Sequence, residues 1–120
     1  MNQTLSMPMV ALRGMTVLPG TVVHFDVSRS KSIEAVHEAM SGEQKIFLVT
    51  QKDIEVQEPG QEDLYRMGTI ATIKQIIKLP KQILRVVIAG EERAVLNVIE
   101  VMEPYMVGNV TVIPEEECNI

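Results

Sequence analysis

The second half of the chain is a succession of apolar segments separated by very short polar connections. Segments rich in β-branched residues follow one another at residues 69–79, 83–89, 94–101 and 107–113. The breaks between them contain Pro80, Gly90 with two glutamates, and Pro104, which are typical of turns. Because a parallel pair of strands needs a crossover of about a dozen residues or more, these short breaks favour antiparallel neighbours. The pattern predicts a meander of mainly antiparallel strands.

The first half adds three strand-like segments, near Val10 and at residues 21–27 and 46–50. Apolar and polar residues alternate over 21–27, so Phe25 is predicted to face a core while His24 and Asp26 face the other side. The run at 46–50 is continuously apolar and too short for a helix, which indicates a central strand.

One segment has a helical period. Ile33, Val36 and Met40 recur at helical spacing, Ser30 or Ser32 can cap the start, and Gly42 can end it. These residues predict one α-helix at about 31–41. A chain of 120 residues is long enough for one domain with its own core, so we expect a single α+β domain that is mostly β.

No arrangement of residues is typical of a catalytic, metal or cofactor site. The single Cys118 stands in a charged tail without a nearby histidine, and no Gly-x-Ser-x-Gly motif occurs. His24 and His37 are the only histidines and do not have the spacing of a zinc site. The seven glycines are dispersed rather than gathered in a phosphate-binding loop. We therefore expect no catalytic, metal-binding or cofactor-binding residues.

Charge and targeting signals limit the expected partners. With 11 basic and 16 acidic residues, the net charge of -5 repels polyanions, so no nucleic acid is expected. No apolar run approaches the roughly 18 residues that span a bilayer, and the first residues lack the features of a secretion signal. A single cysteine cannot form an internal disulfide. We expect a cytoplasmic protein without a membrane partner.

Two loops provide candidate contact residues. Met15, Leu18 and Pro19 form an apolar loop, and Arg29, Ser30 and Lys31 form a charged rim before the helix; the alternative for both is a merely solvated loop. Methionine is flexible and suits adaptable binding surfaces. The eight methionines include several in turn-adjacent places, and we expect a patch of exposed apolar side chains there, made of Met7, Met9, Met15 and Met106 with Leu18 and Tyr105. Met67 and Met40 are expected in the core.

A series of motifs between Pro8 and about Ile113, in order and at similar spacing, resembles the opening of bacterial Lon proteases. The motifs are Pro8 to Gly14 (PMVALRG), Leu18-Pro19, Val27 to Ile33 (VSRSKSI), Val49 to Asp53 (VTQKD), Glu58 to Gly60 (EPG), Asp63 to Ala71 (DLYRMGTIA), Leu79-Pro80, and Arg85 to Gly90 (RVVIAG) followed by Arg93-Ala94.

The resemblance implies a PUA-like pseudo-barrel of about six strands with one helix, covering residues 1–114. The acidic tail, residues 115–120, would then begin a linker to helical, AAA+ and protease modules that this chain does not contain. The domain would be a non-catalytic unit that recognises unfolded or damaged protein substrates and helps to assemble a ring, in which the parent is a homohexamer. The parent would be an ATP-dependent serine endopeptidase, with ATP and Mg bound outside this fragment.

Two other interpretations remain open. The domain could act chiefly in self-association, because free strand edges readily pair with copies of themselves. The PUA-like fold also allows an RNA binder, although the acidic balance argues against it. The chain departs from the family at Ser28, where glycine is usual, and at Lys81-Gln82, where Asp-Gly is usual, so the turn type at Lys81-Gln82 is left open.

Overall fold

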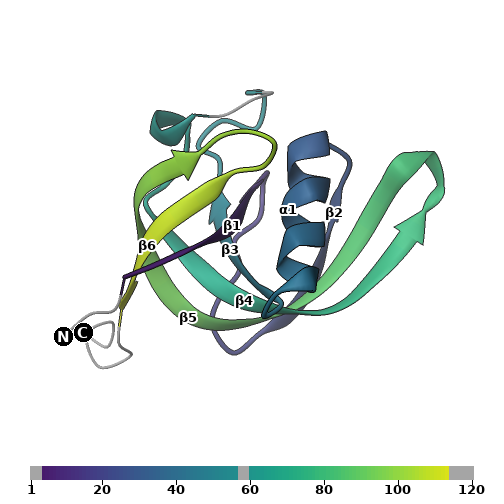
Figure 1. Ribbon diagram of the computed structural model, residues 1–120, viewed down its shortest axis with the longest axis horizontal. Coiled ribbons are helices and arrows are strands. Elements are labelled where there is room, and N and C mark those ends of the chain that lie inside the picture. Colours follow the sequence, from purple (N-terminus) through teal and green to yellow (C-terminus); the bar gives the residue numbers. More distant parts are fainter. Residues whose placement is uncertain (1–3, 57–59, 114–120) are drawn as a thin grey trace.

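The computed structural model describes residues 4–56 and 60–113, which contain six strands and one α-helix (Figure 1). The predicted tail at 115–120, together with Cys118, lies outside the described residues, as does part of the Glu58 to Gly60 motif. The elements are β1 (Thr4–Leu12), β2 (Val22–Val27), α1 (Ser30–Ser41), β3 (Lys45–Thr50), β4 (Met67–Leu79), β5 (Ile83–Val101) and β6 (Val107–Ile113), with short 3-10 turns at Gln61–Asp63 and Pro80–Gln82. The predicted class, a mostly β domain with one helix near 31–41, is confirmed.

The strands form one sheet that closes on itself. Their order is β2-β5-β4-β3-β1-β6, and an additional pairing of β5 with β6 closes the ring into a pseudo-barrel. All strand pairs except one are antiparallel, which confirms the prediction of mainly antiparallel strands. The exception is the parallel pair of β1 with β3. A closed sheet has no free edges. Among the six described strands, β2 stands outside the closed ring and pairs only with β5, so its other edge is free of them.

β5 is one continuous strand of 19 residues, whereas the sequence predicts two strands separated by a turn at Gly90. That prediction is wrong. The half before Gly90 pairs with β2 and the half after it pairs with β6, while β4 accompanies most of both halves. Glu91 and Glu92 are exposed at this change of partner. The polar break therefore marks a bend inside a strand and not a chain reversal.

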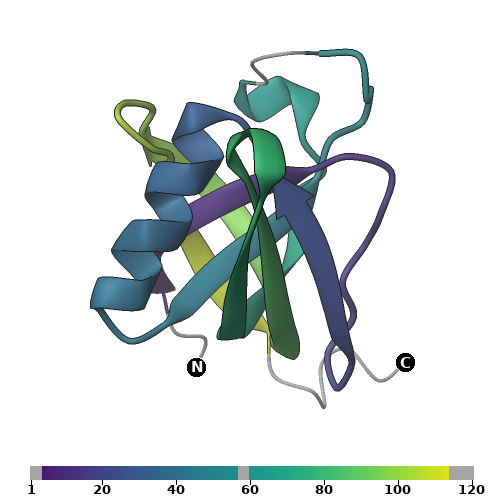
Figure 2. The same cartoon turned by 90° about the vertical axis from the view of Figure 1, so that its right-hand side faces the viewer.

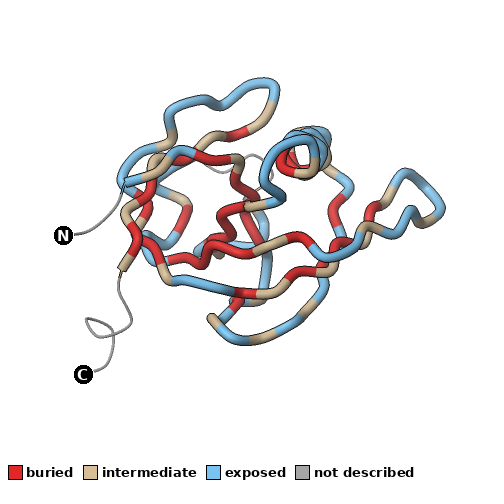
Figure 3. Tube along the Cα trace, turned by 60° about the horizontal axis from the view of Figure 1, so that its bottom comes forward, coloured by how far each residue is buried: buried red, intermediate tan, exposed pale blue. Residues whose placement is uncertain are grey.

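The interior consists of two apolar clusters. Figure 3 shows where the buried residues lie along the chain. The cluster below α1 includes the predicted inward residue Phe25, and the other cluster surrounds Phe47, which is fully buried. The methionines differ from expectation. Met7, Met9 and Met106 are 8%, 1% and 5% exposed and belong to the second cluster, so they form no surface patch, whereas Met67 is 43% exposed. Burial here depends on the closure of the sheet, which places the inner face of β1 inside the barrel.

Helix α1 packs on β1 and β3 (Figure 1). It connects β2 to β3, the strand that runs parallel to β1. Gly42 ends the helix as predicted. The N-cap is Arg29 and makes no side-chain capping bond, so the prediction that Ser30 or Ser32 caps the helix is wrong. Ser32 is buried instead.

The β4–β5 hairpin extends beyond the barrel as an arm (Figures 1 and 2). Its tip, the Pro80–Gln82 turn, is exposed. Lys81 and Gln82 have positive φ angles of 66° and 61°, a left-handed conformation that Asp-Gly or Asn-Gly adopts more readily. Ser28 has no positive φ, so its backbone does not require the family's glycine.

Candidate functional site

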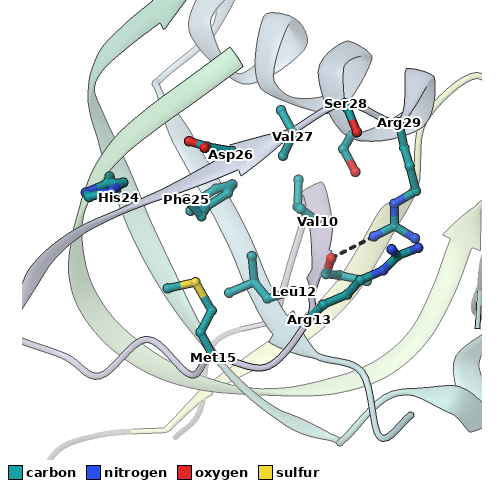
Figure 4. A pocket seen from close by; sticks show the side chains of 12 residues that line it. Val10, Leu12, Arg13, Met15, His24, Phe25, Asp26, Val27, Ser28 and Arg29 are labelled. Carbon is teal, nitrogen blue, oxygen red and sulfur yellow. Dashed lines mark hydrogen bonds between the residues drawn. The ribbon is translucent and has the colours of Figure 1, made fainter. Parts of the chain in front are cut away.

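A groove opens between the end of β1, the outer edge of β2 and the start of α1 (Figure 4). Its volume is about 360 Å³, within the range of sites that bind small ligands or short segments. The lining residues are Val10, Ala11, Leu12, Arg13, Met15, His24, Phe25, Asp26, Val27, Ser28, Arg29 and Ser32. Strands β1 and β2 are not paired with each other, so the groove lies where the sheet leaves a gap.

The interior wall of the groove is apolar. Val10, Leu12, Phe25 and Val27 are each no more than 6% exposed and belong to the core cluster below α1. Met15 packs against the same cluster but is only partly buried, and its side chain lies at one side of the opening (Figure 4). A flexible, polarizable side chain in this position can adapt to apolar groups of different shape.

Arg29 forms the polar end of the groove. Its Nη2 donates to the carbonyl oxygen of Ala11 at 3.0 Å (Figure 4), and the same atom donates to Oε1 of Gln51 at 3.2 Å. Gln51 is 2% exposed, and its amide donates in turn to the carbonyl oxygens of Asp53 and Val56. Arg29 therefore links α1 to β1 and to the chain after β3.

The charge of Arg29 is held in a partly buried place. Burial, with a smaller contribution from the positive charge of Arg13, lowers the pKa of Arg29 from its ordinary value. A guanidinium nevertheless stays protonated at neutral pH. Arg29 thus brings a guanidinium to this end of the groove.

The β2 side of the groove carries His24 and Asp26, which point to the exposed side as the alternation predicts. Asp26 accepts from Arg85 of β5, Nε to Oδ1 at 3.0 Å and Nη2 to Oδ2 at 3.2 Å. The hydrogen bond from Arg85 lowers the pKa of the Asp26 carboxyl, and the Arg85 pKa is raised by the same bond. Asp26 is thus already neutralised by a cation of its own sheet.

The structure brings together two of the six predicted contact residues, Met15 and Arg29. Leu18 is 47% exposed and Pro19 is half-buried in the loop before β2, but neither lines the groove. Ser30 is exposed at the first position of α1, also outside the lining.

Lys31 points elsewhere. It forms an ion pair with Glu103, Nζ to Oε2 at 3.3 Å, and is not among the lining residues. Arg13 lines the groove and was not among the predicted contacts; it directly follows the segment near Val10 in an exposed turn, and that position is the signal that could have identified it.

A second hollow of about 420 Å³ lies between the start of β1 and the end of α1. It contains Glu38, Glu43 and Glu92 with Lys45. Lys45 forms an ion pair with Glu91, whose pKa is lowered chiefly by that bond. None of the predicted contact residues lines this hollow.

Two further findings concern chemistry and membranes. Within residues 4–56 and 60–113, no group of three or more His, Cys, Asp or Glu side chains lies where it could hold a metal ion. In the same part of the chain, no helix has the length and apolar character needed to cross a bilayer.

Comparison with known proteins identifies relatives that match most of the chain. Lon protease of Lachnoclostridium phytofermentans is 49% identical over 108 residues, which are 90% of this chain and 13% of that protein. Lon protease 1 of Bacillus subtilis is 39% identical over 112 residues, 93% of this chain and 14% of that protein. The chain thus spans a small part of the length of these relatives.

Solved structures share the fold. The N-terminal domain of Mycobacterium avium complex Lon protease has a TM-score of 0.73 at 23% identity and covers 92% of this chain and 56% of its own. The Lon N-terminal domain protein from Xanthomonas campestris has a TM-score of 0.70 at 16% identity, covering 92% and 60%. The sequence model of one family, described as the ATP-dependent protease La (LON) substrate-binding domain, matches residues 6–119. On this match and on the 49% identity across most of its length, the chain belongs to the family of Lon substrate-binding domains.

Proposed function

We propose that this chain is the non-catalytic recognition domain of a longer ATP-dependent protease, and that the groove between β1 and β2 holds apolar side chains of unfolded or damaged protein substrates. The observation that carries the proposal is the groove itself, whose floor is formed by the buried Val10, Leu12 and Phe25 and whose opening is flanked by the partly exposed Met15. Unfolded proteins expose aliphatic and aromatic side chains that folded proteins bury. An apolar groove therefore binds an unfolded protein, the client of this domain, in preference to a folded one.

Binding at one groove is expected to be weak, because a volume of about 360 Å³ accommodates only a few side chains. A homohexameric parent would present six such grooves, and several weak contacts along one client chain raise the overall affinity without hindering release at any one site.

The remaining steps would belong to other modules of the parent protein. Binding of ATP with Mg and serine-type peptide cleavage would take place there, in the cytoplasm. Residues 115–120 would begin the connection from this domain, residues 1–114, to those modules.

Titration of the isotope-labelled chain with reduced, carboxymethylated lactalbumin, which stays unfolded, tests the proposal by NMR. We expect chemical shift changes at groove residues such as Met15 and Phe25. The Met15→Gln variant keeps the length of the side chain but makes it polar, and should weaken binding about threefold to tenfold.

Met67→Gln is the matched control, because Met67 is also a partly exposed methionine and does not line the groove. This variant should bind as the unchanged chain does. An absence of shift changes at high client concentration, or equal weakening by both substitutions, contradicts the proposal.

Self-association is a second candidate, favoured by the charge of the β4–β5 arm. No carboxylate occurs between Asp63 and Glu91, whereas Lys74, Lys78 and Lys81 lie on or at the end of β4, in a chain with a net charge of -5. A cationic arm beside exposed Ile77 matches the acidic surface of a second copy.

Sedimentation at low and high salt tests this second candidate. Association through the arm should weaken as salt rises, because exposed charges are screened. Lys78→Glu should abolish it, whereas Lys52→Glu, an exposed lysine outside the arm, should have little effect. A chain that stays monomeric at all concentrations and salt levels rules the arm out as an assembly contact.

A further inference from the structure

We propose that the groove binds its client in a defined backbone geometry: an extended polypeptide segment adds as a strand to the outer edge of β2. This inference rests on the proposed function and specifies it, because it names the bound conformation and the pattern of side chains that the client must carry.

The hydrogen bonds of β2 show which backbone groups are free. Gly90 N donates to Thr21 O at 2.8 Å, and the antiparallel register continues by pairing Val23 with Ile88 and Phe25 with Val86. In an antiparallel pair, residues that bond to the neighbour alternate with residues whose groups point away. The residues between, Val22, His24 and Asp26, therefore point their N–H and C=O groups outward.

These outward groups have no partner in the sheet. β2 pairs with β5 alone, and among the described residues no backbone hydrogen bond reaches His24 or Asp26 from any other segment. The edge thus presents donors and acceptors at the spacing that an added strand requires. Both residues line the groove, so the added strand would lie against its opening.

The opposite wall of the groove is also an incomplete strand edge. Gln51 N donates to Leu12 O at 2.8 Å, so Leu12 faces β3, and the adjacent Ala11 faces away from it. The Ala11 carbonyl oxygen accepts from Arg29 inside the groove. The partner of β1 on this side, β6, pairs only as far as Pro8. The space between β1 and β2 is therefore a gap between two strands.

The chemistry of the walls defines the client. Side chains of an added strand alternate between two faces. One set would face Met15 and the floor of the groove at Leu12 and Phe25, so the client is expected to carry aliphatic or aromatic residues at every second position. The exposed Arg13 lies at one end of the groove, and the carboxylate of Asp26 is paired with Arg85. An acidic residue at that end of the client is favoured over a basic one.

A proline substitution tests the edge without breaking the sheet. Pro lacks the N–H donor and is tolerated at edge positions whose N–H faces away from the ladder. His24→Pro removes one outward donor and should weaken binding of a blocked ten-residue peptide, alternating valine and threonine and ending in two glutamates, by about tenfold. His24→Ala removes the same side chain but keeps the N–H, so it should weaken binding clearly less than His24→Pro does; equal weakening by the two variants would assign the loss to the imidazole and contradict the role of the edge donor.

Methylation of the peptide backbone provides a second test that requires no variant. Two peptides are made, each with N-methyl groups on alternate amides, in opposite phase. In an added strand only alternate amides face β2, so one peptide should lose binding about tenfold or more and the other should retain it.

The outcomes separate this inference from the proposed function. Equal binding of the two methylated peptides, with the unmodified peptide bound at the groove, overturns strand addition but leaves apolar recognition intact. No binding of any peptide or of unfolded lactalbumin contradicts both. A dimer that His24→Pro dissociates, without peptide binding, assigns the edge to a second copy of the chain and also overturns the inference.

Discussion

Gly90 lies against the carbonyl oxygen of Leu18, so closely that a Cβ atom at Gly90 would stand 2.4 Å from that oxygen and 3.2 Å from Cγ1 of Val17. Two hydrogen bonds fix this approach: Gly20 N donates to Gly90 O at 2.9 Å, and Gly90 N donates to Thr21 O at 2.8 Å. The loop between β1 and β2, which carries Met15, is therefore positioned by the bend of β5.

Gly90→Ala is expected to destabilise the protein by about 1–3 kcal/mol, because the added methyl group meets backbone that cannot move without losing these hydrogen bonds. Denaturant unfolding measures the change. Gly60→Ala is the control, since its Cβ would meet nothing closer than 3.6 Å and its φ of -94° suits alanine. It should change stability by less than about 0.5 kcal/mol. Equal effects of the two substitutions would show that the close approach at Gly90 does not exist.

Thr69 holds the same loop from β4. Its Oγ1 donates to the carbonyl oxygen of Val17 at 2.6 Å, and the residue is 1% exposed. Thr69→Val conserves the shape but leaves a buried carbonyl without its donor, which should cost about 1–3 kcal/mol in urea unfolding. Thr4→Val, which removes only an exposed contact of 3.5 Å with Thr111, should be nearly neutral. A Thr69→Val protein with the same free energy of unfolding as the unchanged chain would contradict this role of the hydroxyl.

Local periodicity was sufficient to predict most of the fold. The helix and the inward position of Phe25 follow from the periodicity of apolar residues that are close in sequence, and both predictions are confirmed. Gly90 with two glutamates has the composition of a turn, yet it is a bend, because that difference is decided by which strands pair with β5. The burial of Met9 and the exposure of Met67 depend on the same long-range pairing.

The candidate site was predictable only in part. Sequence reasoning selected Met15 and Arg29, and alternation placed His24 and Asp26 on the outward side. It could not show that β2 lacks a second partner, because a free edge is a property of the whole sheet. The groove exists only because that edge faces the end of β1, and no local pattern records this.

The pKa of Asp26 should lie below its ordinary value of 3.8, because Arg85 donates two hydrogen bonds to the carboxylate. A carboxyl whose pKa is lower in the folded than in the unfolded state stabilises the fold above its unfolded pKa and loses that contribution as pH falls through the folded pKa. The pair therefore contributes at neutral pH and is lost in strong acid. Because both groups are exposed, salt should reduce the shift.

NMR titration of the Asp26 carboxyl carbon measures this pKa directly. Arg85→Gln should return the pKa toward 3.8, whereas substitution of Arg66, an exposed arginine directly before β4, by Gln should leave it unchanged. A pKa of Asp26 at or above 3.8 in the unchanged chain would contradict the geometry of the pair.

Arg29 and Arg13 line the same groove but differ in what they support, and this difference predicts opposite consequences of removing them. The Arg29 guanidinium bonds to Ala11 O and Gln51 Oε1, both part-buried acceptors. Arg29→Met leaves these acceptors unpaired and should lower the free energy of unfolding by about 1–3 kcal/mol. Arg13 is exposed, and its one hydrogen bond to the described residues is a long one to Val56 O at 3.5 Å, so Arg13→Met should change stability by less than about 0.5 kcal/mol. The opposite outcome would be that Arg13→Met lowers stability more, while Arg29→Met affects only client binding. Arg29 would then be a contact residue, as its sequence position suggested, and would not be the link that holds the start of α1 against β1.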